Sequence, residues 1–131
     1  MVPALHRLSD AAKLTQMPLR CLIVDDSELF LVSAVRLLTA QGMEVVGTAH
    51  DSATALELAT SLAPDVAIVD IELGEEDGIE LARQMPPATK VVLISARERD
   101  DVAEVIDTTD VAGFVPKRAL SAAAIEAFVA G

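Results

Sequence analysis

The chain has 131 residues, 52% of them hydrophobic, with 21 acidic and 10 basic side chains and a formal net charge of −11. A single domain is the default at this length, the apolar share argues against disorder, and the acidity makes duplex DNA and anionic membranes poor partners. The first residues lack a secretory pattern, no stretch is long enough to span a bilayer, and the single Cys21 excludes an internal disulfide, so we expect a reducing cytoplasm.

Residues 1–16 differ in character from the rest of the chain, because His6, Arg7 and Lys13 lie among scattered Ala and Leu. We predict that this stretch is an N-terminal extension, either disordered or foreign to the natural chain. The folded domain is then expected to cover residues 17–131.

From Leu19 onward, short apolar runs alternate with segments of helical spacing that carry capping and stop residues. In chain order the predicted elements are a strand at Arg20–Val24, a helix at Ser27–Gln41, a strand at Glu44–Thr48, a helix from Asp51 or Ser52 to about Leu62, a strand at Val66–Val69, a polar loop at Glu72–Asp77, a helix at Gly78–Gln84, a strand at Lys90–Ile94, a weak helix from Asp101 to about Thr108, a strand at Gly113–Val115, and a helix at Ala122–Val129 capped by Ser121.

Strands that alternate with helices predict an α/β fold, with a parallel sheet covered by helices on both faces. The continuous apolar character of the strands agrees with burial on both sides. Ligands of such sheets bind outside the carboxyl ends of the strands, where the strand order reverses.

Polar side chains lie at the ends of four of the five predicted strands. Asp25 and Asp26 end the first strand, and Asp70 ends the third. Ser95 ends the fourth strand, and Lys117 lies two residues beyond the fifth. Each has an ordinary reading alone, as a helix cap, a turn residue or a surface lysine, but together they predict one site for a divalent cation and a phosphoryl group.

The chemistry of such a site depends on its groups. A carboxylate such as Asp70 can attack phosphorus and form an acyl phosphate. Its approach to an anionic donor needs a metal ion for screening and fixed positive charge near the transferred oxygens. Acidic ligands favour Mg²⁺, which takes hard oxygen donors.

Four motifs in this order resemble the receiver domain of two-component response regulators, over about Leu19 to Val129. They are Ile23-Val24-Asp25-Asp26, Val69-Asp70 with Asp77-Gly78 in the next loop, Ile94-Ser95-Ala96, and Gly113-Phe114-Val115-Pro116-Lys117. The pattern looks closest to receivers that precede a helix-turn-helix output domain. The resemblance implies a flavodoxin-like (βα)5 three-layer sandwich with sheet order 2-1-3-4-5.

The resemblance also implies a set of roles. Asp70 would accept a phosphoryl group from a histidine kinase or a histidine phosphotransfer protein. Asp26, Asp70 and the backbone carbonyl of Glu72 would bind Mg²⁺ (or Mn²⁺) directly, and Asp25 would act through water.

In the same family pattern, Ser95 and Lys117 would hold the phosphoryl oxygens. Phe114 would be an aromatic switch that turns inward as Ser95 moves toward the phosphate. The switch would alter a surface of the fourth helix, fifth strand and fifth helix, with homodimerisation as one route to an output.

The chain departs from the family pattern at three positions. Relatives often carry Thr at the Ser95 position and Tyr at the Phe114 position. They commonly carry Pro after the lysine, often with a cis bond, whereas Arg118 comes after Lys117 here. The backbone after the fifth strand is therefore expected to differ.

Glu72 and Arg97 each lie two residues beyond a proposed site residue. In receivers these two positions flank the phosphate. We hypothesise that Glu72 and Arg97 pair across the mouth of the site and hinder attacking water. The plain alternative is two unpaired surface side chains.

Three functional classes compete for these residues. The first is a phosphoacceptor that turns over no external substrate, either as a single-domain regulator or as part of a DNA-binding one. The second is an interaction module that does not use phosphate. The third, a phosphatase with an aspartyl intermediate, normally places Asp-x-Asp on the first strand, which Asp25-Asp26-Ser27 does not match.

Overall fold

The computed structural model describes residues 18–129. The predicted N-terminal extension, residues 1–16, lies outside the described residues. In chain order the elements are β1 (Arg20–Val24), α2 (Glu28–Ala40), β2 (Glu44–Ala49), α3 (Ser52–Leu62), β3 (Val66–Asp70), β4 (Glu72–Leu73), β5 (Glu76–Asp77), α4 (Gly78–Gln84), β6 (Lys90–Ser95), α5 (Arg99–Asp107), β7 (Gly113–Pro116), the 3₁₀ turn η1 (Lys117–Ala119) and α6 (Ala122–Val129).

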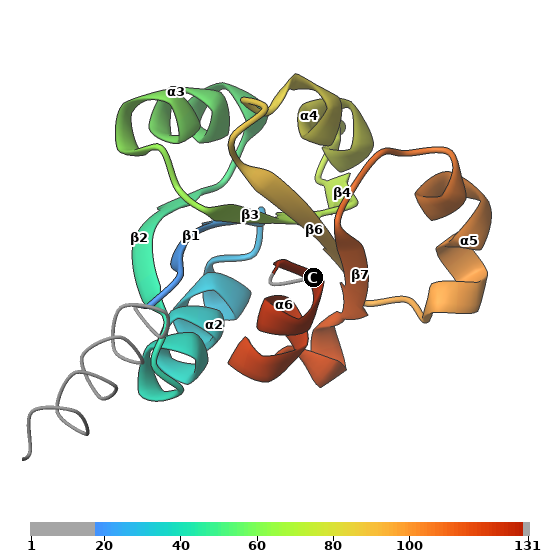
Figure 1. Ribbon diagram of the computed structural model, residues 1–131. Helices are drawn as coiled ribbons and strands as arrows, with labels where there is room; N and C mark the ends of the chain where they lie inside the picture. Colours follow the sequence, from blue (N-terminus) through green and yellow to red (C-terminus); the bar gives the residue numbers. More distant parts are fainter. Residues whose placement is uncertain (1–17, 130–131) are drawn as a thin grey trace, which may run out of the picture.

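The main sheet has five parallel strands in the order β2-β1-β3-β6-β7. Counted along the main sheet alone, this is the predicted order 2-1-3-4-5. Figure 1 shows α3 and α4 on one side of the sheet and α2 and α6 on the other. The predicted three-layer α/β sandwich is confirmed.

Successive residues of each central strand point into two different cores, because side chains alternate along a strand. In β1, Leu22 and Val24 join the core under α3, α4 and α5, whereas Cys21 and Ile23 join the core under α2 and α6. All four are fully buried. Burial raises the pKa of the Cys21 thiol to about 12, so this cysteine is an inert core residue.

Side-chain caps begin the helices where the sequence places polar residues. Ser27 Oγ accepts the backbone N–H three residues on, so Ser27, and not Asp26, caps α2. Asp51 caps α3 by accepting the N–H of Thr54 at 2.8 Å, which decides between the two predicted caps. Ser121 Oγ likewise accepts an N–H at the start of α6, as predicted.

The segment predicted as the polar loop Glu72–Asp77 contains a short antiparallel ribbon, β4 paired with β5. Its turn includes Gly74 at φ +58°, a left-handed conformation that glycine adopts without strain. Leu73 is buried and anchors the ribbon to the core. No strand was predicted here because four of residues 72–77 are acidic, and acidic residues do not form the apolar runs that predict strands.

The other differences lie at element ends. Helix α5 begins at Arg99 rather than Asp101, with Asp100 and Asp101 in its first turn. Acidic side chains there favour the start of a helix, because backbone N–H groups point outward at that end. A 3₁₀ turn, Lys117–Ala119, also comes after β7 and was not predicted.

Gly78 lies where the start of α4 rests directly on the end of β3. A Cβ atom at this position would lie 1.8 Å from the carbonyl oxygen of Asp70. The Gly78 N–H donates to the carbonyl oxygen of Ile71 at 2.9 Å. The missing side chain therefore lets the helix pack against the strand that carries Asp70.

We predict that Gly78→Ala lowers the free energy of unfolding by about 2–4 kcal/mol, because the methyl group overlaps backbone that has no free space to move into. Urea denaturation measures the loss. Gly47→Ala is the matched control, since its Cβ would first meet the flexible end of Leu62 at 3.2 Å. Equal losses in the two variants would contradict the explanation.

Candidate functional site

Strand register brings the predicted polar residues to one edge of the sheet. Val24 of β1 pairs with Val69 of β3, so the next residues along each strand, Asp25 and Asp70, are neighbours. On the other side of β3, Asp70 pairs with Ile94, the residue before Ser95. The acids and the hydroxyl thus gather where the sheet order reverses between β1 and β3.

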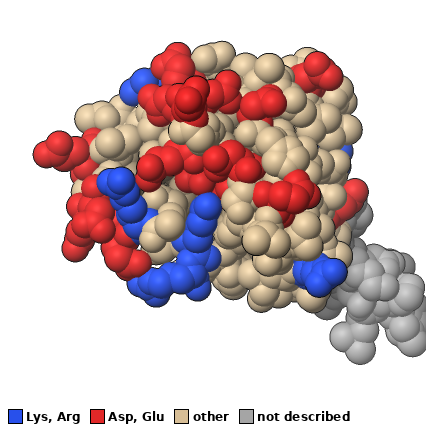
Figure 2. Space-filling view, turned by 180° about the vertical axis from the view of Figure 1, so that it is seen from behind, with Lys and Arg blue, Asp and Glu red and all other residues tan. Residues whose placement is uncertain are grey.

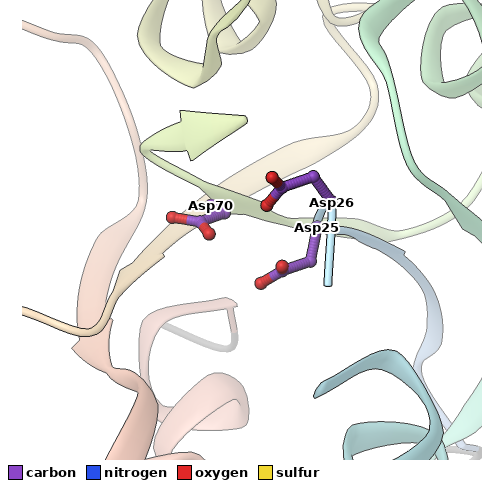
Figure 3. A group of neighbouring side chains, drawn as sticks. All are labelled: Asp25, Asp26 and Asp70. Carbon is purple, nitrogen blue, oxygen red and sulfur yellow. The ribbon is translucent and has the colours of Figure 1, made fainter. Parts of the chain in front are cut away.

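Three carboxylates converge at this edge. One oxygen each from Asp25, Asp26 and Asp70 lies within 4.8 Å of the other two (Figure 3). Asp25 is 0% exposed and Asp70 is 5% exposed, whereas Asp26 is exposed. The trio therefore combines two buried acids with one that faces solvent.

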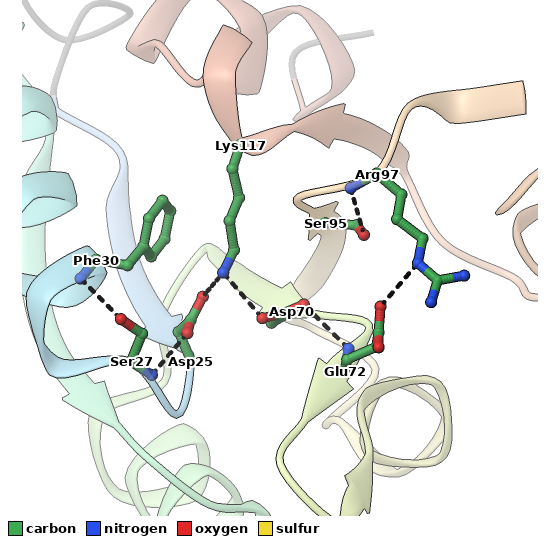
Figure 4. A network of polar contacts seen from close by, with 8 residues as sticks. All are labelled: Asp25, Ser27, Phe30, Asp70, Glu72, Ser95, Arg97 and Lys117. Atoms are coloured by element: carbon green, nitrogen blue, oxygen red, sulfur yellow. Dashed lines mark hydrogen bonds and ion pairs between the residues drawn. The ribbon is translucent and has the colours of Figure 1, made fainter. Parts of the chain in front are cut away.

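The Lys117 side chain reaches from the end of β7 to both buried acids. Its Nζ lies 2.7 Å from Asp25 Oδ2 and 3.0 Å from Asp70 Oδ2 (Figure 4). The lysine side chain is only 20% exposed. One ammonium thus offsets the repulsion between two neighbouring carboxylates.

The two pKa shifts show how the charges are balanced. Burial raises the pKa of Asp70, although the N–H of Glu72 and the ammonium of Lys117 act in the opposite direction. Burial acts to lower the pKa of Lys117, but its contacts with Asp25 and Asp70 outweigh this and the pKa rises. The folded protein therefore binds the Asp70 proton more tightly than the unfolded chain does. As pH rises through the raised Asp70 pKa, this group ionises and the folded state loses stability. Added positive charge beside Asp70 would reduce that loss.

The residues present fit a divalent cation. Three carboxylates offer hard oxygen donors of the kind that Mg²⁺ prefers. Asp25 Oδ2 has no hydrogen-bond partner among the described residues, although the Lys117 ammonium forms an ion pair with it at 2.7 Å. Gly74 leaves space beside Asp26, because a Cβ there would lie 3.2 Å from Asp26 Oδ2. The Glu72 backbone also lies beside the trio, with its N–H donating to Asp70 Oδ1 at 3.0 Å.

Ser95 lies fully buried at the end of β6. Its Oγ accepts the backbone N–H of Arg97 at 3.0 Å, so the hydroxyl hydrogen is still available to donate. The Arg97 side chain turns toward Glu72, and its Nε lies 3.3 Å from Glu72 Oε1. Both side chains of this pair are more than half exposed, so its contribution to stability is under ~1 kcal/mol.

Phe114 of β7 is 7% exposed. It belongs to the same buried cluster as Val102 and Ile106 of α5. Its ring is thus already inward in this structure.

Arg118 takes the position at which the family resemblance leads us to expect proline. No cis peptide bond occurs within residues 18–129, and the chain turns through η1 instead. The Arg118 guanidinium binds both oxygens of Glu98, with Nε 2.8 Å from Oε2. Sequence reasoning missed this pair because 20 residues separate its members and no local pattern links them.

Figure 2 shows acidic side chains spread over the top, middle and left of one face, with most of its lysine and arginine side chains toward the bottom and lower left. This arrangement agrees with the net charge of −11.

Within residues 18–129, we find no helix with the length and apolar character needed to cross a membrane.

Comparisons with known proteins show the family to which the chain belongs. A sequence model of the family described as "Response regulator receiver domain" matches residues 21–129. The chain belongs to this family, and so to the receivers of two-component systems. Magnesium binding and phosphorylation are typical of this family.

One relative is a protein-glutamate methylesterase/protein-glutamine glutaminase from Alkalilimnicola ehrlichii, 39% identical over 109 residues, which are 78% of this chain and 27% of that protein. The chain thus spans about a quarter of this relative's length.

Two solved structures share the fold. The signal receiver domain of NarL from Mycobacterium tuberculosis is 32% identical, with a TM-score of 0.73, covering 87% of this chain and 98% of that one. A LuxR-family response regulator from Aurantimonas is 27% identical, with a TM-score of 0.76, covering 87% and 86%. These neighbours confirm the predicted likeness to receivers that precede a helix-turn-helix output domain.

We predict that Mg²⁺ raises the thermal stability of the domain, because a bound cation relieves the repulsion within the acidic trio. At a hundredfold excess over its dissociation constant, an ion that binds only the folded state adds about 2.7 kcal/mol. Differential scanning calorimetry with and without Mg²⁺ measures the gain. Asp26→Asn is expected to lose most of it, and Glu75→Gln, which removes an exposed acid from the turn between β4 and β5, is expected to keep it. An undiminished gain in Asp26→Asn would exclude the trio as the ion's site.

Proposed function

We propose that this domain accepts a phosphoryl group on Asp70 from a phosphohistidine of a histidine kinase or a histidine phosphotransfer protein. The observation that carries the proposal is the position of the Asp70 carboxylate, beside two further acids and one partly exposed ammonium. A carboxylate in this setting has both an electrostatic partner and neighbouring carboxylate oxygens of the kind that a divalent cation prefers.

In the proposed step, an Asp70 carboxylate oxygen attacks phosphorus. A P–O bond forms, the P–N bond breaks, and the leaving imidazole keeps the electron pair of the broken bond. Asp26, Asp70 and the Glu72 carbonyl would hold Mg²⁺, with Asp25 acting through water. When bound, the ion supplies positive charge that screens the carboxylate from the anionic donor.

Two groups are then assigned to the phosphoryl oxygens. The Lys117 ammonium, now 3.0 Å from Asp70 Oδ2, would exchange this carboxylate contact for a phosphoryl oxygen. The Ser95 hydroxyl, which already accepts the Arg97 N–H, would donate its hydrogen to another phosphoryl oxygen.

Phosphorylation would then change the surface of the domain. Movement of Ser95 toward the phosphate would be coupled to the Phe114 ring, and the surface of α5, β7 and α6 would take a second arrangement. The switch itself needs no turnover of an external substrate.

The wider setting is proposed on the same basis. Residues 17–131 would form the receiver unit, residues 1–16 would form an extension, and the domain would act in the cytoplasm. The NarL and LuxR-family neighbours favour an output in transcription, through dimerisation or another domain. The alternative is a receiver-like module that acts without phosphate, but the full set of Asp25, Asp26, Asp70, Ser95 and Lys117 speaks against it.

We predict that incubation with acetyl phosphate and Mg²⁺ adds the mass of one phosphoryl group to the intact protein. Mass spectrometry is expected to find the gain abolished in Asp70→Asn and retained in Asp110→Asn, which changes an exposed acid away from the trio. If the natural chain gains no mass, the phosphate-independent module becomes the better assignment.

We further predict that the exposed Glu72–Arg97 pair slows hydrolysis of the acyl phosphate by hindering water. Arg97→Ala and Glu72→Ala are each expected to shorten the phosphate lifetime about two- to fivefold, in line with the small energy of an exposed ion pair. Glu72→Ala keeps its backbone carbonyl, so the proposed metal ligand is unaffected.

The matched control is Arg99→Ala, because Arg99 forms a similar exposed pair with Asp107 at 3.5 Å on α5. Decay of the radiolabelled phosphoprotein measures the lifetimes in the natural chain and in the three variants. Lifetimes equal to that of the natural chain in both Glu72→Ala and Arg97→Ala would disprove the gate.

A further inference from the structure

An aromatic ring lies against the ammonium of Lys117. The Lys117 Nζ is 4.4 Å from the centroid of the Phe30 ring. Phe30 belongs to the first turn of α2 and is half-buried, packing against the core under α2 and α6. Figure 4 shows the ring beside the lysine side chain, on the side away from Ser95.

The ring completes the surroundings of the ammonium. A lysine ammonium has three N–H donors and no acceptor. Two carboxylates, Asp25 and Asp70, contact the Lys117 nitrogen at 2.7 and 3.0 Å. The face of an aromatic ring carries negative charge density and attracts a cation within about 6 Å. The Phe30 ring thus occupies a side of the ammonium that water would otherwise hydrate.

The turn that positions Asp25 also positions Phe30. The Ser27 N–H donates to Asp25 Oδ1 at 2.8 Å, and Ser27 Oγ accepts the Phe30 N–H at 3.2 Å. The backbone N–H and the side-chain hydroxyl of Ser27 therefore fix the Asp25 carboxylate and the Phe30 backbone relative to each other.

We propose that Phe30 is a positioning residue for Lys117, and that its ring holds the ammonium while it passes from the Asp70 carboxylate to the transferred phosphoryl group. The proposal rests on the function proposed above. It assigns a role in that reaction to a residue outside the acidic trio, the hydroxyl and the lysine.

The physical reason lies in the directionality of the two kinds of contact. A hydrogen bond prefers an angle above about 150° and weakens steeply below about 120°. Attraction to a ring face acts over the whole face, so the ammonium can shift along the ring without losing it. Because the ring lies on the side of the ammonium away from Ser95, it holds the ammonium without blocking the side on which a phosphoryl oxygen would be bound.

The test compares Phe30→Leu, which removes the ring, with Phe30→Tyr, which keeps an aromatic face. With acetyl phosphate and Mg²⁺, the phosphorylation rate of Phe30→Leu is expected to fall about three- to tenfold, the range of a partly buried cation–π contact. Phe30→Tyr is expected to restore most of the rate. Phe128→Leu is the matched control, because it removes a partly exposed ring on α6 that packs against Gly113.

A second readout needs no phosphorylation. The ring current of Phe30 is expected to shift the NMR signals of the Lys117 methylene next to Nζ upfield in the natural chain and in Phe30→Tyr. The shift is expected to disappear in Phe30→Leu and to persist in Phe128→Leu. A merely structural role for Phe30 would not require the tyrosine variant to recover both the shift and the rate.

The outcomes separate the two proposals. If the natural chain and every variant fail to gain phosphate, the proposed function is wrong, whatever the NMR shift. If all of them are phosphorylated and Phe30→Leu reacts as fast as the natural chain, the function stands and the role of Phe30 is wrong. A slow Phe30→Leu that Phe30→Tyr does not rescue also overturns it, since shape rather than the aromatic face would then matter.

Discussion

The functional edge of this domain depends on one ammonium held between two buried carboxylates. Asp25 and Asp70 end neighbouring strands, and both are almost entirely removed from solvent. Two like charges in such a place are unfavourable unless a cation lies with them, and removing that cation leaves them uncompensated. Lys117, which follows the outer strand β7, supplies this charge and so links β7 electrostatically to β1 and β3. Any change of charge at Asp70 therefore acts directly on the lysine.

The rest of the site is built from contacts of very different strength. The strands beneath it are buried on both faces and form a rigid base. The segment after β6, in contrast, is held by the hydrogen bond from the Arg97 N–H to Ser95 Oγ and by two exposed ion pairs, Glu72–Arg97 and Glu98–Arg118. Exposed pairs contribute little, so this segment can change its arrangement at small cost. A rigid base with a weakly held rim suits a domain proposed to convert a local charge into a surface change.

Much of the fold could be predicted because its signals are local. The apolar runs that became β1, β3 and β6 are continuous, as strands buried on both faces must be. Ser27, Asp51 and Ser121 precede the helices that they cap. The β4–β5 ribbon could not be predicted, because its stability comes from Leu73 packing on the core rather than from its own acidic sequence. The start of α5 was missed by two residues, since Glu98 has no side-chain cap bond there.

The sequence by itself determined which residues end the strands, and the fixed direction of parallel strands determined that these residues share one edge. Only the tertiary structure decided which of them touch. Strand order placed Asp25 beside Asp70, and the turn after β7 brought Lys117 over both. It also brought Phe30 against Lys117 and Glu98 against Arg118. Such contacts join residues from separate elements, and their geometry depends on how whole helices pack on the sheet, which no local pattern encodes.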